Sequence, residues 1–436
     1  MNTEINKRKN IKLFPLYMMF GEDFVFLYAI EFVFLVSVKG FAAADVLLVD
    51  ALIPLFQVIT NIPCTIAINR LGKRKSVVIG NIFMCIFLLA LIFGPNVYVI
   101  LACTIFNAIG FNLKKMTESN ILADSINMHE KNGRFFYSTI YSTGYRNYLI
   151  LDGITSFFTG LTFLVNGYLP IFISLALMLV ATIVSFFFKP TSEDEIKKLK
   201  GEEKHKKKKV SLVKEYKTEF VKLFRDFKKI ILSGRMRAFL LLVFLLSGLI
   251  LGMYSVRETL LTDYFVVDAT TFAIILSGWT LIGCFEDHVQ EWLSKKFRNR
   301  TISFIAYTFL IITILAGVVC LSGLPLNAQL VICVVMFAGQ YVLHSAYDVL
   351  MVSYSKNFTT KELRVKISAC YEFVRNISSF LIALLFSFLI RNVDIIPSIL
   401  IIGVGFMVLL LLANIYINKH FGLKPSKYEK NDVFAK

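Results

Sequence analysis

Long apolar runs separated by short polar connections form the main pattern of this chain. A helix needs roughly 20 mostly apolar residues to cross a bilayer. Because the runs are continuous and do not alternate with period two, they predict helices and not the strands of a barrel. We expect twelve membrane-spanning helices, near residues 14–38, 46–68, 76–95, 97–124, 137–163, 168–188, 238–262, 271–293, 301–322, 327–353, 367–390 and 396–418. The predicted fold class is therefore an all-α membrane protein.

A long polar stretch divides these spans into six and six. The pattern predicts an N-terminal bundle over 1–188, a linker over 189–236, a C-terminal bundle over 237–418 and a tail over 419–436. The start of the linker is dense in charge, which is typical of disorder. Its second part predicts an amphipathic helix on the inner membrane surface, through Leu212, Tyr216, Phe220, Leu223, Phe227 and Ile231 at helical spacing. A passive tether and a regulatory element are both open interpretations of this linker.

A basic turn between two apolar runs occurs once in each half of the chain. The first copy runs from Asn69 to Lys75 and the second from Lys295 to Arg300, and Arg70 and Lys296 are 226 residues apart. An Arg-Asn dipeptide is also repeated with nearly the same offset, since Arg146-Asn147 and Arg375-Asn376 are 229 residues apart. The two offsets predict an internal repeat in which the halves are similar helical bundles.

The distribution of basic residues predicts the orientation. The formal net charge is +17, yet the lysines and arginines lie mainly in short connections and in the linker, where they would meet lipid head groups rather than nucleic acid. With a cytosolic N-terminus, forty basic residues fall on the inside, and only Lys39 and Arg391 fall on the outside. We therefore expect a multi-pass protein of the plasma membrane with both termini in the cytosol and no nucleic-acid partner.

Composition narrows the chemistry further. The chain is 56% hydrophobic, and its seven cysteines are scattered without a CxxC pair or a Cys/His cluster. These cysteines are interpreted as small packing residues. No phosphate-binding loop of the Gly-x-x-x-x-Gly-Lys-Ser/Thr type occurs. We expect a monomer in the lipid bilayer, without catalytic residues, metal or cofactor.

The basic turn, the basic linker and the six-plus-six arrangement resemble the major facilitator superfamily. That family's turn reads Gly-x-x-x-Asp-Arg-x-Gly-Arg-Arg/Lys. Here Arg70, Gly72, Lys73 and Arg74 match its basic and glycine positions, while Asn69 replaces the acid and Thr65 replaces the first glycine. The resemblance implies two six-helix bundles related by a pseudo-twofold axis along the membrane normal, with the substrate site between them near the midplane.

The resemblance also implies a cytosolic gate, in which the turn locks one conformation with an acid at the end of the fourth span. Asp124 is at that position here. The residues carried over to the gate are Asn69, Arg70, Gly72, Arg74, Asp124, Lys296 and Arg300.

Two signatures of antiporters in the family are missing. The fourth span has no arginine in Phe106-Asn107-Ala108-Ile109-Gly110, and the fifth span has Gly144, Gly153 and Gly160 without the Gly-Pro core. The glycines are also explained by close helix packing. The likeness thus favours the transporter fold more than the antiporter subclass.

Charges inside the spans are the candidates for contact with a substrate or a coupled proton, because a charge in hydrocarbon costs several kcal/mol unless it faces a cavity or a partner. The candidates are Asp23, Glu31, Lys114, Glu118, Arg146, Asp152, Tyr254, Arg257, Glu258, His344, Asp348, Glu372 and Arg375. Structural alternatives stay open for several of them. Lys114–Glu118 and Glu372–Arg375 fit intrahelical ion pairs, and Arg257 fits a side chain that snorkels to the outer interface. Glu22 and Glu286 are interpreted as hydrated residues near the cytosol.

The sequence therefore predicts a secondary transporter that works by alternating access. We expect proton-coupled export of small amphiphilic or drug-like molecules, with an acid of the first span, Asp23 or Glu31, as the proton site. This hypothesis is contradicted if both Asp23→Asn and Glu31→Gln leave pH-driven transport intact. Proton-coupled uptake of a small polar nutrient is the alternative. A membrane-embedded enzyme and a non-transporting sensor are less favoured: the enzyme would form a product without solute flux, and the sensor would show no solute flux.

Overall fold

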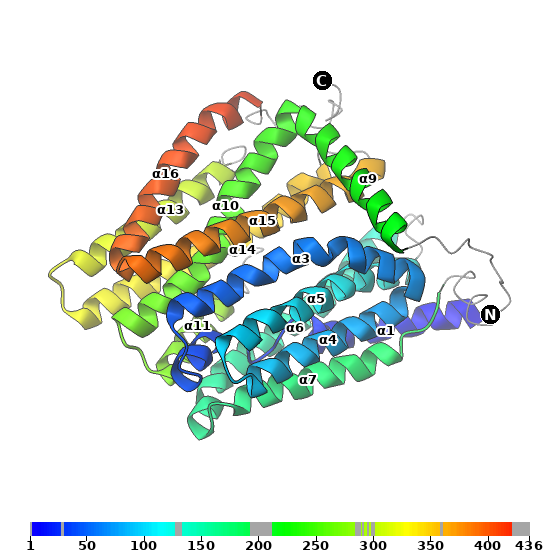
Figure 1. The fold of residues 1–436 in the computed structure, drawn as a ribbon, viewed down its shortest axis with the longest axis horizontal. Coiled ribbons are helices and arrows are strands. Elements are labelled where there is room, and N and C mark those ends of the chain that lie inside the picture. The colour runs from blue at the N-terminus through cyan, green and yellow to red at the C-terminus, as the bar shows by residue number, and fades with distance from the viewer. Residues whose placement is uncertain are drawn as a thin grey trace. The chain divides into compact units, whose positions relative to one another are not determined.

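The computed structural model describes residues 2–27, 30–126, 133–191, 212–283, 301–357 and 361–420, together with 289, 292, 293, 296 and 297. Helices make up nearly all of this part of the chain (Figure 1). Ten of the described helices are long and apolar enough to cross a membrane, and Thr270–Trp279 is a shorter apolar helix. The predicted all-α membrane fold is confirmed.

The chain divides into two compact units. The first consists of residues 1–34 and 56–221, and the second of residues 35–55 and 222–436. Helix α3 (Ala43–Leu71) contributes to both, because its first part belongs to the second unit and its remainder to the first.

The first unit is built mainly from six helices, which are α1 (Asn2–Gly21), the later part of α3, α4 (Lys73–Phe93), α5 (Val97–Ser125), α6 (Gly133–Val165) and α7 (Leu169–Phe186). Helices α4 and α5 approach so closely that a Cβ on Gly80 would lie 2.8 Å from the carbonyl oxygen of Gly110. A Cβ on Gly110 would lie 2.7 Å from the Gly80 carbonyl. Two small residues opposite each other are a common basis for tight helix contact in membranes.

The second unit contains α10 (Gly234–Thr259), the π-helix η2 (Leu260–Tyr264), α11 (Ala269–Gly283), α13 (Thr301–Leu321), α14 (Leu326–Asn357), α15 (Lys361–Asn392) and α16 (Ile395–His420). Polar side chains tie these helices together. The Ser378 hydroxyl donates to the Phe244 carbonyl, and the Trp279 indole N–H donates to the Val334 carbonyl at 3.0 Å. Each bond satisfies a polar group that lipid would leave without a partner.

The first predicted span is wrong as a single helix. Helix α1 ends at Gly21, and the chain becomes helical again only in α2 (Glu31–Val33) and the π-helix η1 (Phe34–Val38). The break has local causes. Gly21 is a poor residue for a helix interior, and the Asp23 carboxylate accepts a hydrogen bond from the Phe24 amide at 3.0 Å, which stabilises a turn. Phe26 within the break has a positive φ of 70°.

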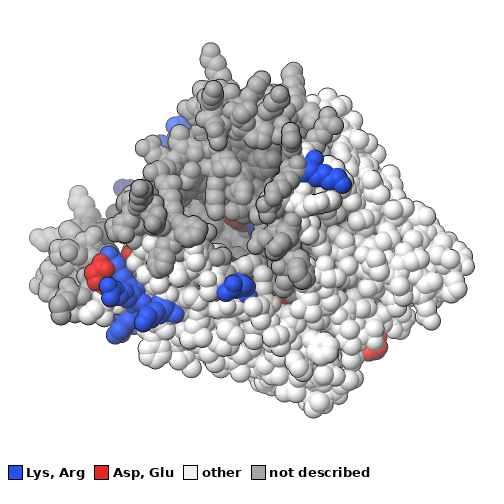
Figure 2. All heavy atoms as spheres, turned by 180° about the vertical axis from the view of Figure 1, so that it is seen from behind, with Lys and Arg blue, Asp and Glu red and all other residues white. Residues whose placement is uncertain are grey.

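The predicted amphipathic helix corresponds to α9 (Leu212–Leu232), whereas residues 192–211 lie outside the described part. Tyr216, Phe220 and Phe224 are exposed on α9. Further along, the Phe227 ring packs edge-on against Phe373 of α15, with ring centroids 5.5 Å apart. The placement of α9 on a membrane surface stays a prediction. In Figure 2 most of the described surface in view carries neither acidic nor basic side chains, as a lipid-facing surface requires.

Candidate functional site

The break after α1 is held by a buried lysine from α5. The ammonium group of Lys114, whose side chain is fully buried, donates to the carbonyl oxygens of both Gly21 and Glu22. These carbonyls lie at the end of a helix, where they lack intrahelical partners. Lys114 therefore stabilises the irregular backbone of the first span, and it is not simply the partner of Glu118.

Lys115, the next residue, connects two acids. Its ammonium group forms an ion pair with Glu22 at the end of α1 and lies 3.4 Å from a carboxylate oxygen of Glu118 on α5. The alternative of an intrahelical ion pair between Lys114 and Glu118 needs correction, because the ion pair of Glu118 within α5 uses Lys115, three residues away. Glu22 is 7% exposed, so its interpretation as a hydrated residue near the cytosol is wrong.

Each acid of this group keeps one oxygen without a hydrogen-bond partner among the described residues. These are Oε2 of Glu22 and Oε2 of Glu118, both buried. We call Glu22, Lys114, Lys115 and Glu118 the four-charge cluster. Its two positive and two negative charges sum to zero when all are ionised. Burial and neighbouring charges are both causes that change how readily such an acid takes up a proton.

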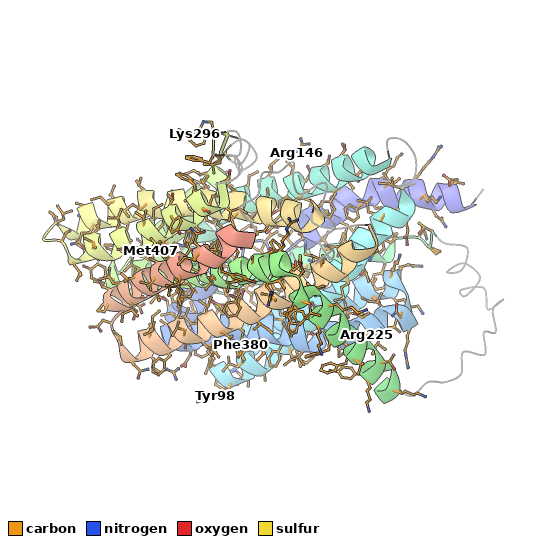
Figure 3. All side chains as sticks on the ribbon, turned by 90° about the horizontal axis from the view of Figure 1, so that it is seen from above. Tyr98, Arg146, Arg225, Lys296, Phe380 and Met407 are labelled. Carbon is orange, nitrogen blue, oxygen red and sulfur yellow. The ribbon has the colours of Figure 1, made fainter. Side chains whose placement is uncertain are left out.

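Only some of the other predicted site residues of the first unit lie near the four-charge cluster. Asp152 on α6 lies within electrostatic range of Asp23, and Asp23 within range of Lys114. Glu31 is the first residue of α2 and is partly exposed. Arg146 is exposed on α6 (Figure 3). The structure therefore brings Asp23, Asp152, Lys114 and Glu118 into one region and leaves Arg146 on a surface.

In the second unit, three helices meet around Arg257. Its guanidinium carbon lies 4.4 Å from the ring centre of Tyr254 and 5.7 Å from that of Trp279. The Tyr254 hydroxyl and the Nδ1 atom of His344 are 2.6 Å apart. Arg257 is 1% exposed, so the alternative that it snorkels to the outer interface is wrong.

The remaining candidates of the second unit are less tightly held. Arg375 lies 3.6 Å from Glu372 in the same helix, and both side chains are substantially exposed. This geometry fits the intrahelical pair that was left open. Glu258 is partly buried, and the side chain of Asp348 lies outside the described part of the chain.

The basic turn brings its charges to the acid at the end of α5. Gly72, with a φ of 86°, precedes α4 in a conformation that favours glycine. Lys73 pairs with Asp124 at 2.5 Å, and Arg74 donates to the Phe186 carbonyl at 3.0 Å. Asn69 and Arg70 are exposed. Asp124 thus lies against the turn, with Lys73 as its partner.

The second basic turn is described only in part. The Lys296 ammonium group lies over the Trp292 ring at 4.7 Å from its centre, and Arg300 lies outside the described residues. Four relevant residues were missing from the predicted sites, namely Glu22, Lys73, Lys115 and Trp279. A signal existed for Lys115, which adjoins Lys114 in the same span. No such signal existed for Trp279, because it is one of many aromatic residues within the apolar runs.

Comparison with known proteins identifies the family of the chain. No curated protein matches the chain in sequence. Among solved structures, the nucleoside transporter NupG superposes with a TM-score of 0.68 at 12% identity, over 95% of this chain and 99% of that one. A POT family transporter in complex with 5-aminolevulinic acid gives 0.64 at 15% identity, over 96% of each chain.

A D-xylose-proton symporter also gives a TM-score of 0.64, at 12% identity, over 97% of this chain and 98% of that one. These identities show a shared fold. The model of the Major Facilitator Superfamily matches residues 14–383, which is most of the chain. The chain therefore belongs to the Major Facilitator Superfamily and is a membrane transporter rather than an enzyme.

Proposed function

We propose that the protein is a proton-coupled secondary transporter of a small polar solute. The observation that carries the proposal is the four-charge cluster at the break in the first span. Buried ionisable groups within membrane spans are costly to maintain and commonly mark proton relays or substrate paths. Broken helices occur at membrane depth where they line a site, and here the break and the charges coincide.

The cluster offers a physical route from protonation to movement. Lys115 is shared between Glu22, which directly follows α1, and Glu118 on α5. When one of these acids takes up a proton, its attraction for Lys115 is lost and the lysine pairs with the other. Because Glu22 lies in the break directly after α1 and Glu118 lies on α5, this exchange changes the connection between that break and α5. Protonation thereby acts on the break after α1, which Lys114 also stabilises.

The solute is polar in this proposal, because buried charges fit hydrogen-bonding groups better than the apolar surface of a drug-like molecule. The relatives in fold include a nucleoside transporter and a D-xylose-proton symporter, which agrees with polar solutes moving with protons. We therefore favour uptake together with protons. Proton-driven export, which the sequence predicted with Asp23 or Glu31 as the proton site, differs from this proposal in the relative direction of solute and proton and in the acid that takes up the proton.

We further propose that both termini face the cytosol and that the protein resides in the plasma membrane. The support is the excess of forty basic residues on one side over two on the other. Labelling of single cysteines added before α1 and after α16, with a reagent that cannot cross membranes, tests this orientation. Labelling of intact cells at either terminus would overturn it.

The function is tested in proteoliposomes that contain a pH-sensitive dye. A panel of small polar solutes is added outside, and proton movement into or out of the lumen is recorded. Symport predicts acidification of the lumen together with solute entry, whereas antiport predicts alkalinisation. Glu118→Gln should abolish the proton signal, while Glu4→Gln, a control outside the predicted spans, should not. Solute flux that is unchanged in Glu118→Gln and insensitive to pH would contradict the proposal.

A further inference from the structure

Arg257 has an unusual environment for an arginine inside a membrane protein. It is 1% exposed, and its Nη1 atom has no hydrogen-bond partner among the described residues. Its Nε atom donates to the Met253 carbonyl at 3.0 Å. Leaving a charged donor buried without a partner costs free energy. An acceptor on a bound solute would remove this cost, since the described residues provide none for Nη1.

The aromatic side chains around the guanidinium group fix its plane. Tyr254 and Trp279 come from different helices, and both rings lie within cation–π distance of Arg257. The rings are themselves anchored, because the Tyr254 hydroxyl bonds to His344 and the Trp279 N–H bonds to the Val334 carbonyl. A guanidinium group held in this way loses little side-chain entropy when it binds a ligand.

The backbone next to Arg257 is also irregular. The π-helix η2 begins three residues later, at Leu260, and single π-helical turns are frequent at functional sites. Such a turn shifts the register of the following residues, so that α10 leaves its regular path immediately beyond the arginine. The buried, unsatisfied donor and the irregular turn thus lie side by side in one helix.

We infer that Arg257 binds a carboxylate group of the transported solute, an inference that rests on the proposed transport function. The Nη1 atom of Arg257 can donate a charge-assisted hydrogen bond to a carboxylate, which is stronger than a hydrogen bond between neutral groups. Glu258 adds a negative charge close to Arg257, which disfavours a doubly charged anion such as phosphate and favours a single carboxylate. The solute is accordingly a small polar molecule with one carboxylate.

The inference is tested by thermal unfolding of the purified full-length protein with matched probes. Small monocarboxylates, including hydroxy and amino acids, are each compared with the corresponding primary amide, and inorganic phosphate is included. At least one carboxylate should raise the Tm by about 2 °C or more at saturation, and its amide should not. Equal shifts by acid and amide, a shift by phosphate alone, or no shift by any carboxylate would overturn the inference.

Variants locate the effect. Arg257→Gln should lose the carboxylate shift, and Arg257→Lys should weaken binding by about tenfold or more, because it keeps the charge but not the planar fork. Arg237→Gln, near the start of the same helix, is the matched control and should bind as the unmodified protein does. If Arg257→Gln does not fold, Arg257→Lys and the acid–amide comparison still decide the outcome. Unchanged binding in Arg257→Lys would overturn the inference.

The outcome is separable from the proposed function. Proton movement driven equally by neutral solutes and carboxylates would leave the transport function intact and reject the role of Arg257. Carboxylate binding that depends on Arg257, without any proton movement in proteoliposomes, would support the binding site and reject proton coupling.

Discussion

Arg391 in the last turn of α15 forms an ion pair with Asp45 in the first turn of α3. Beside it, the buried Ser387 hydroxyl donates to the Ala44 carbonyl at 2.9 Å. The ion pair is largely exposed, and pairs of this kind contribute about 0–1 kcal/mol. A contact this weak is easily opened and closed, and we propose that it does so during transport.

Charge reversal tests that proposal. Asp45→Arg and Arg391→Asp should each lower the free energy of unfolding by about 1 kcal/mol or less and change the rate of solute exchange several-fold. The double variant restores opposite charges and should recover the original rate. The measurements are exchange in proteoliposomes and unfolding of purified protein. Single variants with unchanged exchange would show that the pair has no part in the transport cycle.

Removal of Lys115 should be far more damaging than removal of an exposed lysine. Lys115→Met removes the ion-pair partner of the buried Glu22 and Glu118 carboxylates and leaves Lys114 as the one cation of the four-charge cluster. Breaking a buried pair typically costs about 3–5 kcal/mol. Lys73→Met, which breaks the exposed pair with Asp124, is the matched control and should cost about 0–1 kcal/mol. Thermal unfolding in detergent compares them. Equal losses would mean that the four-charge cluster contributes no more than a surface pair.

Glycine substitutions test the close contact of α4 and α5. Gly80→Ala would place a methyl group against the Gly110 carbonyl, and overpacking of this kind costs about 1–3 kcal/mol. Gly278→Ala is the control, because a Cβ there has nothing within 4 Å. Alanine is favoured over glycine within a helix by up to about 1 kcal/mol, so the control should be neutral or stabilised. A neutral Gly80→Ala would show that the helices can separate at little cost.

Asp268, which lies outside the predicted spans, makes the free energy of unfolding depend on pH. Its carboxylate accepts hydrogen bonds from the Thr271 hydroxyl at 2.6 Å and from the Thr270 and Thr271 amides, which lowers the pKa of Asp268 below its ordinary value. A lowered pKa stabilises the folded state above the unfolded-state pKa, and the contribution disappears as the pH falls through the folded-state value.

The difference in Tm between the unmodified protein and Asp268→Asn should therefore be constant near neutral pH and shrink below about pH 4. Asparagine retains much of the capping geometry, so the comparison isolates the charge. Asp268→Ala removes the cap as well and should cost about 1 kcal/mol at neutral pH. A difference between the unmodified protein and Asp268→Asn that stays constant down to pH 3 would contradict the assignment.

Most spans were predictable because bilayer thickness imposes a minimum length of apolar sequence. Apart from α9 in the linker, the helices from α3 to α16 follow the predicted ranges within a few residues, except that α11 is described only as far as Gly283 of the predicted span 271–293. The break between α1 and α2 was not predicted, because the local features at Gly21 and Asp23 act together with contacts between residues far apart in the sequence. Lys114 is 93 residues from Gly21. Likewise, Glu22 reads as hydrated from its position in the chain and becomes buried only through Lys115. Hydropathy indicates which segments are apolar, but it does not indicate which distant charged residue will pair with a buried charge.

Helix α3 passes from the second compact unit to the first between Leu55 and Phe56, and Pro54 immediately precedes Leu55. Proline has no amide hydrogen and its ring crowds the preceding turn, so a helix is most easily bent there. Pro54 thus leaves α3 without one backbone hydrogen bond close to the residue where the helix passes from one unit to the other. The consequence is mechanical. Bending of α3 at Pro54 leaves the helical segments on both sides intact.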